Sequence, residues 1–315
     1  MSVAVIGGGA FGTALAIVIA KTQCVKLWAR SASHVAELKI SQENKYRLPG
    51  VKFPKLLKVT SELKDVFDAD IILFAIPMQA LTDFVEQYNL VGKTVVACCK
   101  GIDLETGQCP SVILNNAAHT AVLTGPSFAR DIALGLPAAL TLACANPVAL
   151  AHLQVALSTP TLRLYRTTDV VGAEIGGALK NVISIGCGAV IGAGLGESAR
   201  AALMTRGFAE MVRFASVLGA QPETLMGLSG LGDLALTCTS NQSRNYQYGF
   251  AIGAGIESDK NLTVEGISTA RALRNLTTKL NLDLPVCIAV ADLVDNKVNI
   301  NSAVDRLLAR PLKEE

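Results

Sequence analysis

One lysine lies in the middle of an apolar, glycine-rich stretch, where a charged side chain needs a chemical explanation. Lys180 lies in the run GGALKNVISIG. A buried ammonium group costs several kcal/mol, on the order of 3 or more, unless an interaction or a function compensates for it. If the run is helical, one face carries the residues at spacings of three and four, namely Gly176, Gly177, Lys180, Ser184 and Gly188. This bare face can receive another helix or a ligand. Because helix packing alone gives no reason for the lysine, we favour a cofactor and a substrate beside it.

The chemistry available to such a lysine is proton transfer. A reductase that uses a nicotinamide must deliver a hydride to a carbonyl carbon and a proton to the carbonyl oxygen. The proton donor works best when its pKa lies near the working pH, and the ordinary lysine value of about 10.4 falls when the amine is desolvated or lies near another cation. In a chain that binds a nicotinamide, Lys180 is therefore predicted to be the acid/base group of a reductase.

A second group of polar side chains lies in GLSGLGDLALTCTSNQSRNYQYG, residues 227–249. Ser243 is placed to cap a new helix, and the free amides at that helix start, together with Arg244, would form a receptor for phosphate or carboxylate. Asp233 could hydrogen-bond a substrate hydroxyl or pair with Lys180. The alternative is a polar turn between helices, with Asp233 as a local cap.

A glycine-rich run at the start of the chain suggests a nucleotide site. VAVIGGGAFGTALA places Gly7, Gly9 and Gly12 in a GxGxxG spacing between an expected strand and an expected helix. The first glycine permits the tight turn, the second lets the backbone approach a pyrophosphate, and the third allows close packing of helix and strand. The alternative is a glycine-rich turn in some other α/β protein.

The end of the second expected strand indicates which nicotinamide is used. An NAD-specific site offers Asp or Glu to the ribose 2′-hydroxyl about 20 residues after the glycines. Here the chain has Trp28, Ala29, Arg30 and Ser31. Arg30 could pair with a 2′-phosphate, which favours NADPH over NADH; the alternative is a solvated charge at a strand end.

Two further segments end expected strands at the edge where ligands bind in this architecture. Lys100 follows VVACC and could polarise a carbonyl or meet a phosphate, or could simply be solvated. The run LTGPSFARD contains Gly125, Pro126 and Ser127, a turn whose backbone amides can face a ligand.

These residues need two kinds of scaffold to position them. In the first half of the chain, short β-branched runs alternate with helical stretches, which predicts a parallel sheet covered on both faces. The expected strands begin at Val3, Val25, Leu57, Ile71, Thr94, Thr120, Ala138 and Leu162. From Asp169, a helix cap, the periodicity stays helical to the end. The expected fold class is α/β, a doubly wound Rossmann domain over 1–167 followed by an all-helical substrate-binding and catalytic domain over 168–315.

Composition excludes several classes of protein. The 315 residues carry a net charge of +2 without a charged block, which argues against nucleic acid as a partner. The eight cysteines and three histidines are scattered, so we expect no metal site, no disulfides and a cytoplasmic location. Residues 175–196 are about long enough to cross a bilayer, but a central lysine is unfavourable there, so no membrane span is expected.

Motifs spread over nearly the whole chain resemble the bacterial NAD(P)-dependent glycerol-3-phosphate dehydrogenase family. They are GGGAFGTALA, NKYRLPG, KGI, LTGPSFA, GALKNVISIG, ARAALMTRGFAEM, SGLGDLALTCTSNQSRN and VEG. The resemblance implies interconversion of dihydroxyacetone phosphate and sn-glycerol 3-phosphate, which supplies membrane phospholipids. It also implies a C-terminal domain like that of 6-phosphogluconate dehydrogenase. A homodimer is the default expectation.

The resemblance also implies roles for individual residues. Lys180 would be the acid/base, with Asp233 beside it. Substrate contacts fall on Lys100, Gly125, Ser127, Lys180, Asp233, Ser243, Arg244 and Asn245. Cofactor contacts fall on Phe11, Arg30, Lys100, Ala129, Arg244 and Glu265, to which the expected set adds Gly7, Gly9, Ala10, Gly12 and His34.

Two departures from the family pattern and two other functions are kept open. Gly196, Glu197 and Ser198 replace a common GDN, which could alter a helix connection, and YQYG after Asn245 removes basic residues near the expected phosphate pocket. The same fold could instead reduce ketopantoate or another small keto or hydroxy acid. It could also be a non-catalytic NADPH-binding sensor, because fold alone does not establish chemistry.

Overall fold

The computed structural model describes residues 1–259 and 263–311, and these form two compact units. The first contains residues 1–100 and 109–174, and the second contains residues 101–108, 175–259 and 263–311.

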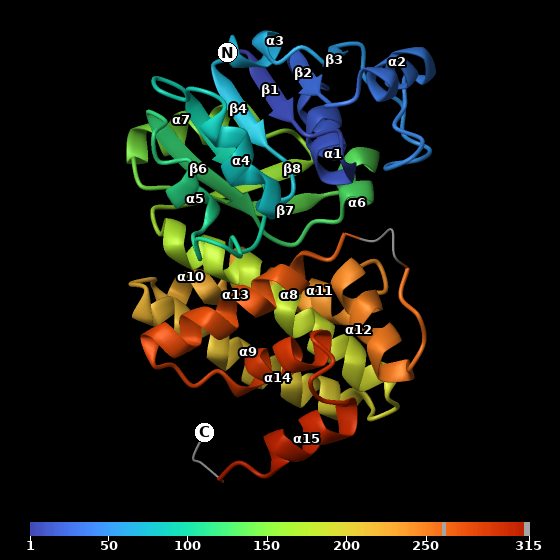
Figure 1. The fold of residues 1–315 in the computed structure, drawn as a ribbon. Coiled ribbons are helices and arrows are strands. Elements are labelled where there is room, and N and C mark those ends of the chain that lie inside the picture. The colour runs from blue at the N-terminus through green and yellow to red at the C-terminus, as the bar shows by residue number, and fades with distance from the viewer. Residues whose placement is uncertain (260–262, 312–315) are drawn as a thin grey trace. The chain divides into compact units, whose positions relative to one another are not determined.

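The first unit is built on one eight-stranded sheet with strand order β3-β2-β1-β4-β5-β6-β7-β8 (Figure 1). The expected strands all form, some with one or two residues more or fewer. They are β1 (Val3–Ile6), β2 (Val25–Trp28), β3 (Leu57–Thr60), β4 (Ile71–Phe74), β5 (Thr94–Ala97), β6 (His119–Thr124), β7 (Ala138–Cys144) and β8 (Leu162–Thr167). Reversal of strand order beside β1 is the doubly wound arrangement predicted from the sequence.

One strand pair differs from the expected parallel sheet, because β6 and β7 are antiparallel, with Thr124 opposite Thr141. The connection between them contains only α6 (Ala129–Leu134), a helix of six residues. Six helical residues rise about 9 Å, whereas a six-residue strand is about 20 Å long. The helix therefore cannot carry the chain back along the sheet, and β7 starts at the edge where β6 ends.

Helices cover both faces of this sheet, as predicted. One core joins the sheet to α1 (Ala10–Ile19), α2 (Ala32–Ser41), α6 and α7 (Pro147–Leu157). The other face packs against α3 (Lys64–Phe67), the 3₁₀ turn η1 (Met78–Ala80), α4 (Leu81–Glu86), Leu114 just after α5 (Pro110–Ile113), and the start of α8 (Val170–Gly192). Burial on both faces accounts for the nearly continuous apolar character of β1 and β4.

The rest of the described chain after β8 contains helices and no strand, which agrees with the expected helical domain. After α8 come α9 (Glu197–Val217), α10 (Pro222–Met226), the π-helical turn η2 (Leu228–Gly232), α11 (Asp233–Thr239), α12 (Arg244–Ala254), α13 (Glu265–Leu280), α14 (Pro285–Val294) and α15 (Ile300–Leu308). The Asp169 carboxylate accepts a hydrogen bond from the Gly172 amide at 2.9 Å, so it caps α8 as predicted. By length and composition α8 could cross a membrane, but 89% of its most apolar 18-residue stretch is buried inside the protein.

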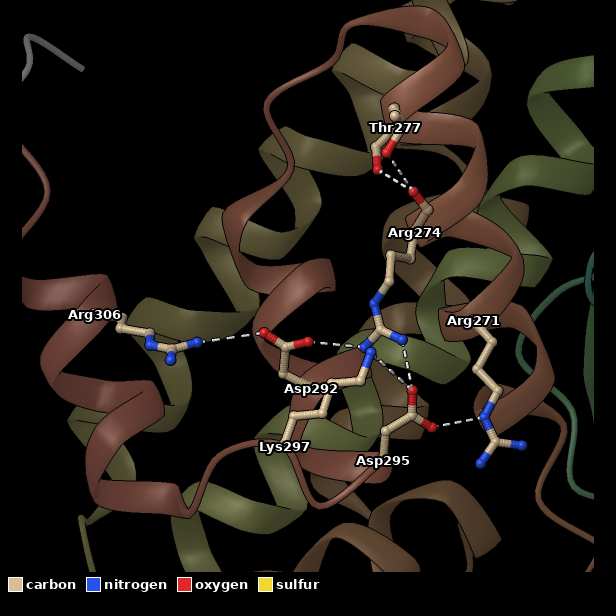
Figure 2. A network of polar contacts seen from close by, with 8 residues as sticks. Arg271, Arg274, Thr277, Asp292, Asp295, Lys297 and Arg306 are labelled. Atoms are coloured by element: carbon tan, nitrogen blue, oxygen red, sulfur yellow. Dashed lines mark hydrogen bonds and ion pairs between the residues drawn. The ribbon is translucent and has the colours of Figure 1, made fainter.

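A network of ion pairs joins the last three helices of the second unit (Figure 2). Arg274 on α13 contacts Asp292 of α14 at 2.9 Å and also binds Asp295, just after α14. Arg271 reaches Asp295 at 2.8 Å, and Arg306 of α15 reaches Asp292 at 3.4 Å. Hydrogen bonds from the two arginines of α13 hold the pKa of Asp295 below its ordinary value. These charges are partly exposed, so the network orders the helices without a large contribution to stability.

Two buried carboxylates act as caps for helices that have no side-chain cap of their own. Glu174 accepts hydrogen bonds from the backbone amide and hydroxyl of Ser111, at 2.7 and 2.6 Å, in the first turn of α5. Glu210 accepts from the amides of Val286 and Cys287, at 2.7 and 3.0 Å, in the first turn of α14. A negative charge at a helix N-terminus is favourable. Burial nevertheless has the larger effect on the pKa of both carboxyl groups. It raises the pKa of Glu210 above its ordinary value and that of Glu174 to about 7.

We expect the Glu174→Gln substitution to change how stability depends on pH. Because the folded pKa lies above the ordinary value of 4.5, the folded state binds the extra proton between about pH 4.5 and 7. The wild type therefore loses stability as pH rises through this window, up to on the order of 3 kcal/mol. The variant should lack this loss in chemical-denaturant unfolding measured from pH 4.5 to 8. The control is Glu86→Gln, at an exposed position on α4; a wild type and a Glu174→Gln variant with parallel pH profiles would contradict the prediction.

Candidate functional site

The three glycines of the turn after β1 differ in the space that lies beside them. Gly7 has φ +126°, a region that favours glycine, and a Cβ there would overlap the carbonyl of Ala75. A Cβ on Gly12 would overlap the carbonyl of Gly7, so this glycine permits α1 to pack closely. A Cβ on Gly9 would meet nothing within 4 Å, so the middle of the turn is open. This is the geometry that the three roles expected of the glycines require.

The start of α1 is suited to an anion. Gly9 is its N-cap and supplies no side-chain cap, and the first turn contains no acidic residue. That first turn begins with Ala10 and Phe11. No N-cap side chain occupies its backbone amides, because Gly9 has none. The Phe11 ring packs partly buried against the core below. An anion approaching the turn would meet the positive end of the helix.

Two candidate cofactor residues, Arg30 and His34, follow the end of β2. Arg30 follows β2 and is exposed. His34 lies in the first turn of α2, and its ring carbon Cε1 lies 3.6 Å from the position that a Gly8 Cβ would occupy. The Ser31 hydroxyl caps α2 by accepting from the His34 amide. His34, which sequence position alone could not place, thus lies beside the turn.

Lys100, Gly125 and Ser127 form a second group in the first unit. The Lys100 ammonium donates to the Gly125 carbonyl at 3.2 Å, and the Ser127 hydroxyl donates to the same carbonyl at 3.0 Å. Gly125 has φ +137°, so the chain turns sharply at the end of β6. Ala129 begins α6 directly after this turn and is partly buried. The structure therefore brings together three of the substrate contacts implied by the resemblance.

The predicted acid/base group lies in a fully formed polar cluster of the second unit. The Lys180 side chain is 10% exposed and the Asp233 side chain 1%, with 2.9 Å between the ammonium nitrogen and Oδ1. Lys180 also donates to the Thr237 hydroxyl at 2.8 Å, and that hydroxyl lies 3.2 Å from the same Asp233 oxygen. The carboxylate therefore both compensates the buried charge and fixes the direction of the ammonium.

Thr237 is a member of this cluster that the sequence prediction did not assign to the site. It lies one helical turn after Asp233 on α11, so both side chains face Lys180. The segment is a π-helical turn followed by α11, and the alternative of a polar turn with Asp233 as a local cap is wrong. The sequence DLALT does indicate this role, because Asp233 and Thr237 are four residues apart and therefore share one face of a helix.

The start of α12 has the cap predicted for it. The buried Ser243 hydroxyl accepts from the Tyr246 amide at 3.2 Å and lies 3.2 Å from the Ser184 hydroxyl of α8. The next residue, Arg244, is exposed. A helix start with an adjacent guanidinium is the arrangement expected of an anion receptor.

Asn245 joins three elements through its side-chain amide. It donates to the Asn181 side chain at 2.9 Å and accepts from the Gly266 amide at 3.0 Å. Glu265, an expected cofactor contact, is the first residue of α13 directly before Gly266. Asn181, the residue after Lys180, is therefore connected to the start of α12 and to the start of α13.

The bare face of α8 is occupied by protein backbone, which corrects our interpretation of that face. A Cβ on Gly176 would overlap the Ser229 carbonyl. Further along, the carbonyls of Tyr246 and Phe250 on α12 fill the space beside Gly188 and Gly192. In return, Gly249 and Gly253 of α12 lie against the carbonyls of Ile185 and Ala189 on α8. These glycines permit close approach of neighbouring helical segments, and only Lys180 supports the chemical interpretation of this stretch.

Comparisons with known proteins cover both units. The family model for the N-terminus of NAD-dependent glycerol-3-phosphate dehydrogenase matches residues 2–150, and the model for its C-terminus matches residues 169–305. Curated proteins named glycerol-3-phosphate dehydrogenase [NAD(P)+] from Ruegeria sp. (strain TM1040) and Roseobacter denitrificans are each 55% identical, over 100% of both chains. A crystal structure of glycerol-3-phosphate dehydrogenase from Coxiella burnetii is similar with a TM-score of 0.93 at 34% identity, covering 98% of this chain and 99% of that one. The chain therefore belongs to the family of NAD-dependent glycerol-3-phosphate dehydrogenases.

Proposed function

We propose that the protein transfers a hydride between NAD(P)H and dihydroxyacetone phosphate to give sn-glycerol 3-phosphate. Full-length similarity to curated enzymes of that name supports the reaction. The observation that carries the proposal within this chain is the buried Lys180, held at 2.9 Å by Asp233 and at 2.8 Å by Thr237. This arrangement is what proton transfer to a ketone oxygen requires.

The glycine turn fits a nicotinamide dinucleotide. Gly9 leaves room for a pyrophosphate, and α1 has no side-chain cap to compete with one. When bound, the reduced nicotinamide supplies the hydride. We assign its contacts to the glycine turn with Ala10 and Phe11, and to Arg30, His34, Lys100, Ala129, Arg244 and Glu265.

Lys180 donates the proton in the reductive direction. Its ammonium gives a proton to the ketone oxygen and becomes a neutral amine, and in the oxidative direction the amine takes the proton from the alcohol. Asp233 and Thr237 hold the nitrogen in one orientation through both steps. Fixed donors at the place where charge develops lower the barrier without reorganisation.

The substrate phosphate would be bound by backbone amides and cations. We assign this role to the α12 start, with Ser243, Arg244 and Asn245, and we propose Lys100, Gly125 and Ser127 as further substrate contacts. A guanidinium can bind phosphate through two parallel hydrogen bonds, and helix-start amides add the positive end of the dipole. We also propose that residues 1–167 form the dinucleotide-binding domain and that residues 168–315 form the helical domain, which supplies the acid/base and the larger share of the substrate contacts.

Steady-state assays with candidate substrates test this function. Dihydroxyacetone phosphate should be reduced, and ketopantoate and a 3-keto acid should not. Turnover of one of those acids in preference to dihydroxyacetone phosphate would replace the proposed substrate. NADPH binding without turnover of any of them would favour a sensor.

We expect Arg30→Glu to reduce the preference for NADPH. The wild type should have the higher kcat/KM with NADPH, because the exposed Arg30 can pair with the 2′-phosphate. The reversed charge should lower the NADPH-to-NADH ratio of kcat/KM by about 100-fold, since a favourable ion pair becomes a repulsion. Arg166→Glu, at an exposed site on β8, is the control. A wild type that prefers NADH would contradict the assignment of Arg30.

We further propose that the product supplies glycerophospholipid synthesis in the cytoplasm and that the enzyme is a homodimer. All eight cysteines are free thiols and six are buried, which suits a reducing compartment. Cell fractionation tests the location. Light scattering should give twice the 32.9 kDa mass of one chain, and the single-chain mass would exclude the dimer.

A further inference from the structure

An asparagine in the loop after α2 is completely buried among exposed neighbours. Asn44 has 0% exposure, whereas Lys45, Tyr46 and Arg47 directly after it are exposed. A buried side-chain amide is costly unless its hydrogen bonds are made. The buried Asn44 side chain must therefore be stabilised by hydrogen bonds within the protein.

The Asn44 amide connects this loop to the glycine turn. Its Nδ2 donates to the Gly8 carbonyl at 3.0 Å and to the Thr13 hydroxyl at 2.9 Å, and its Oδ1 accepts from the Arg47 amide at 3.2 Å. A backbone carbonyl can only accept and a backbone amide can only donate, so these partners determine which end of the side chain is nitrogen. Both hydrogens of the amide are used.

These bonds fix the plane of one peptide group in the turn. The structure contains no cis peptide bond in the described residues, so the Gly8 carbonyl and the Gly9 amide hydrogen point in opposite directions. The carbonyl points to Asn44, so the Gly9 amide points away from it. Gly9 is exposed, and the space beside its α-carbon is open.

We propose that Asn44 is a positioning residue that holds the Gly8–Gly9 peptide so that the Gly9 amide faces the pyrophosphate of the dinucleotide. The inference rests on the proposed function, because it requires that the turn bind the cofactor. Asn44 itself does not contact the ligand. Without it, the peptide can rotate, because glycines have few conformational restrictions, and the amide is lost as a donor.

The test measures ligands with and without a pyrophosphate. Asn44→Ala should raise the KM and the Kd for NADPH about tenfold, equivalent to about 1.4 kcal/mol. The inhibition constant of ADP should rise similarly, whereas that of adenosine 2′-monophosphate, which lacks a pyrophosphate, and the KM for dihydroxyacetone phosphate should stay within about twofold of the wild type. The matched control is Asn146→Ala, which removes two cap hydrogen bonds from α7. It should lower thermal stability without changing NADPH affinity.

Several outcomes would overturn the inference. An Asn44→Ala variant with unchanged NADPH affinity, or with equal losses for ADP and adenosine 2′-monophosphate, would do so. If Asn44→Ala does not fold, Asn44→Asp keeps the shape and the acceptor for Arg47 but sets an oxygen against the Gly8 carbonyl, and it should weaken NADPH binding at least as much. A wild type that reduces no dihydroxyacetone phosphate would instead contradict the proposed function, and the Asn44 comparison could still be made by NADPH binding.

Discussion

Replacing Lys180 with methionine is expected to lower kcat about 10³-fold while the Kd for NADPH stays within about threefold of the wild type. Methionine is also unbranched and only one atom shorter than lysine, and it removes the proton that the ketone oxygen must receive. General acid catalysis contributes about 10² to 10⁴ in rate, which sets the expected size. The measurement is steady-state reduction of dihydroxyacetone phosphate, with NADPH binding followed by fluorescence titration.

The fold of this variant needs a separate check, because the Asp233 carboxylate loses its ion-pair partner. Thr237 remains 3.2 Å from it and continues to donate a hydrogen bond. Thermal unfolding of Lys180→Met should therefore remain cooperative. A folded variant with wild-type kcat would remove Lys180 from the mechanism.

Replacing Asp233 with asparagine is expected to lower the free energy of unfolding by about 3 kcal/mol and to reduce kcat as well. The loss arises because the Lys180 ammonium stays buried without a carboxylate. The matched control is Glu197→Gln, which removes the exposed ion pair to Arg200 on α9 and should cost less than about 1 kcal/mol. Chemical-denaturant unfolding at neutral pH measures both.

A double mutant separates the charge effect from other losses. In Lys180→Met combined with Asp233→Asn no charge remains buried in the pair, so the loss of stability should be smaller than the sum of the two single losses. Additive losses would mean that the two residues stabilise the protein independently, contrary to the 2.9 Å contact.

Much of the first unit could be predicted because its signals are local. Most strands are short apolar runs, several of them rich in β-branched residues, and the glycine turn is defined by spacing alone. The antiparallel pairing of β6 with β7 was not predicted. It depends on the length of α6 relative to the neighbouring strands, and the sequence pattern does not express that comparison.

For the site, the sequence identifies Lys180 but not the groups that lie against its helix. Lys180 was recognisable because a charge within an apolar run needs a reason. The glycines beside it are equally suited to contact with a helix or with a ligand, so the sequence alone does not distinguish these two roles. Asn44 begins the NKYRLPG motif, but the sequence does not predict its contact with the glycine turn, because an asparagine before exposed charged residues resembles an ordinary loop residue.

The glycines shared by α8 and α12 have a consequence for how this protein can change over time. Because backbone touches backbone there, no side chain can adjust to absorb an added methyl group, and Gly188→Ala would have to move the whole of α12. That helix carries Ser243 and Arg244 at its start, while α8 carries Lys180. The backbone contact thus fixes the distance between Lys180 and the start of α12. If these two groups bind opposite ends of the substrate, as we propose, a substrate of different length would have to be accommodated elsewhere in the molecule.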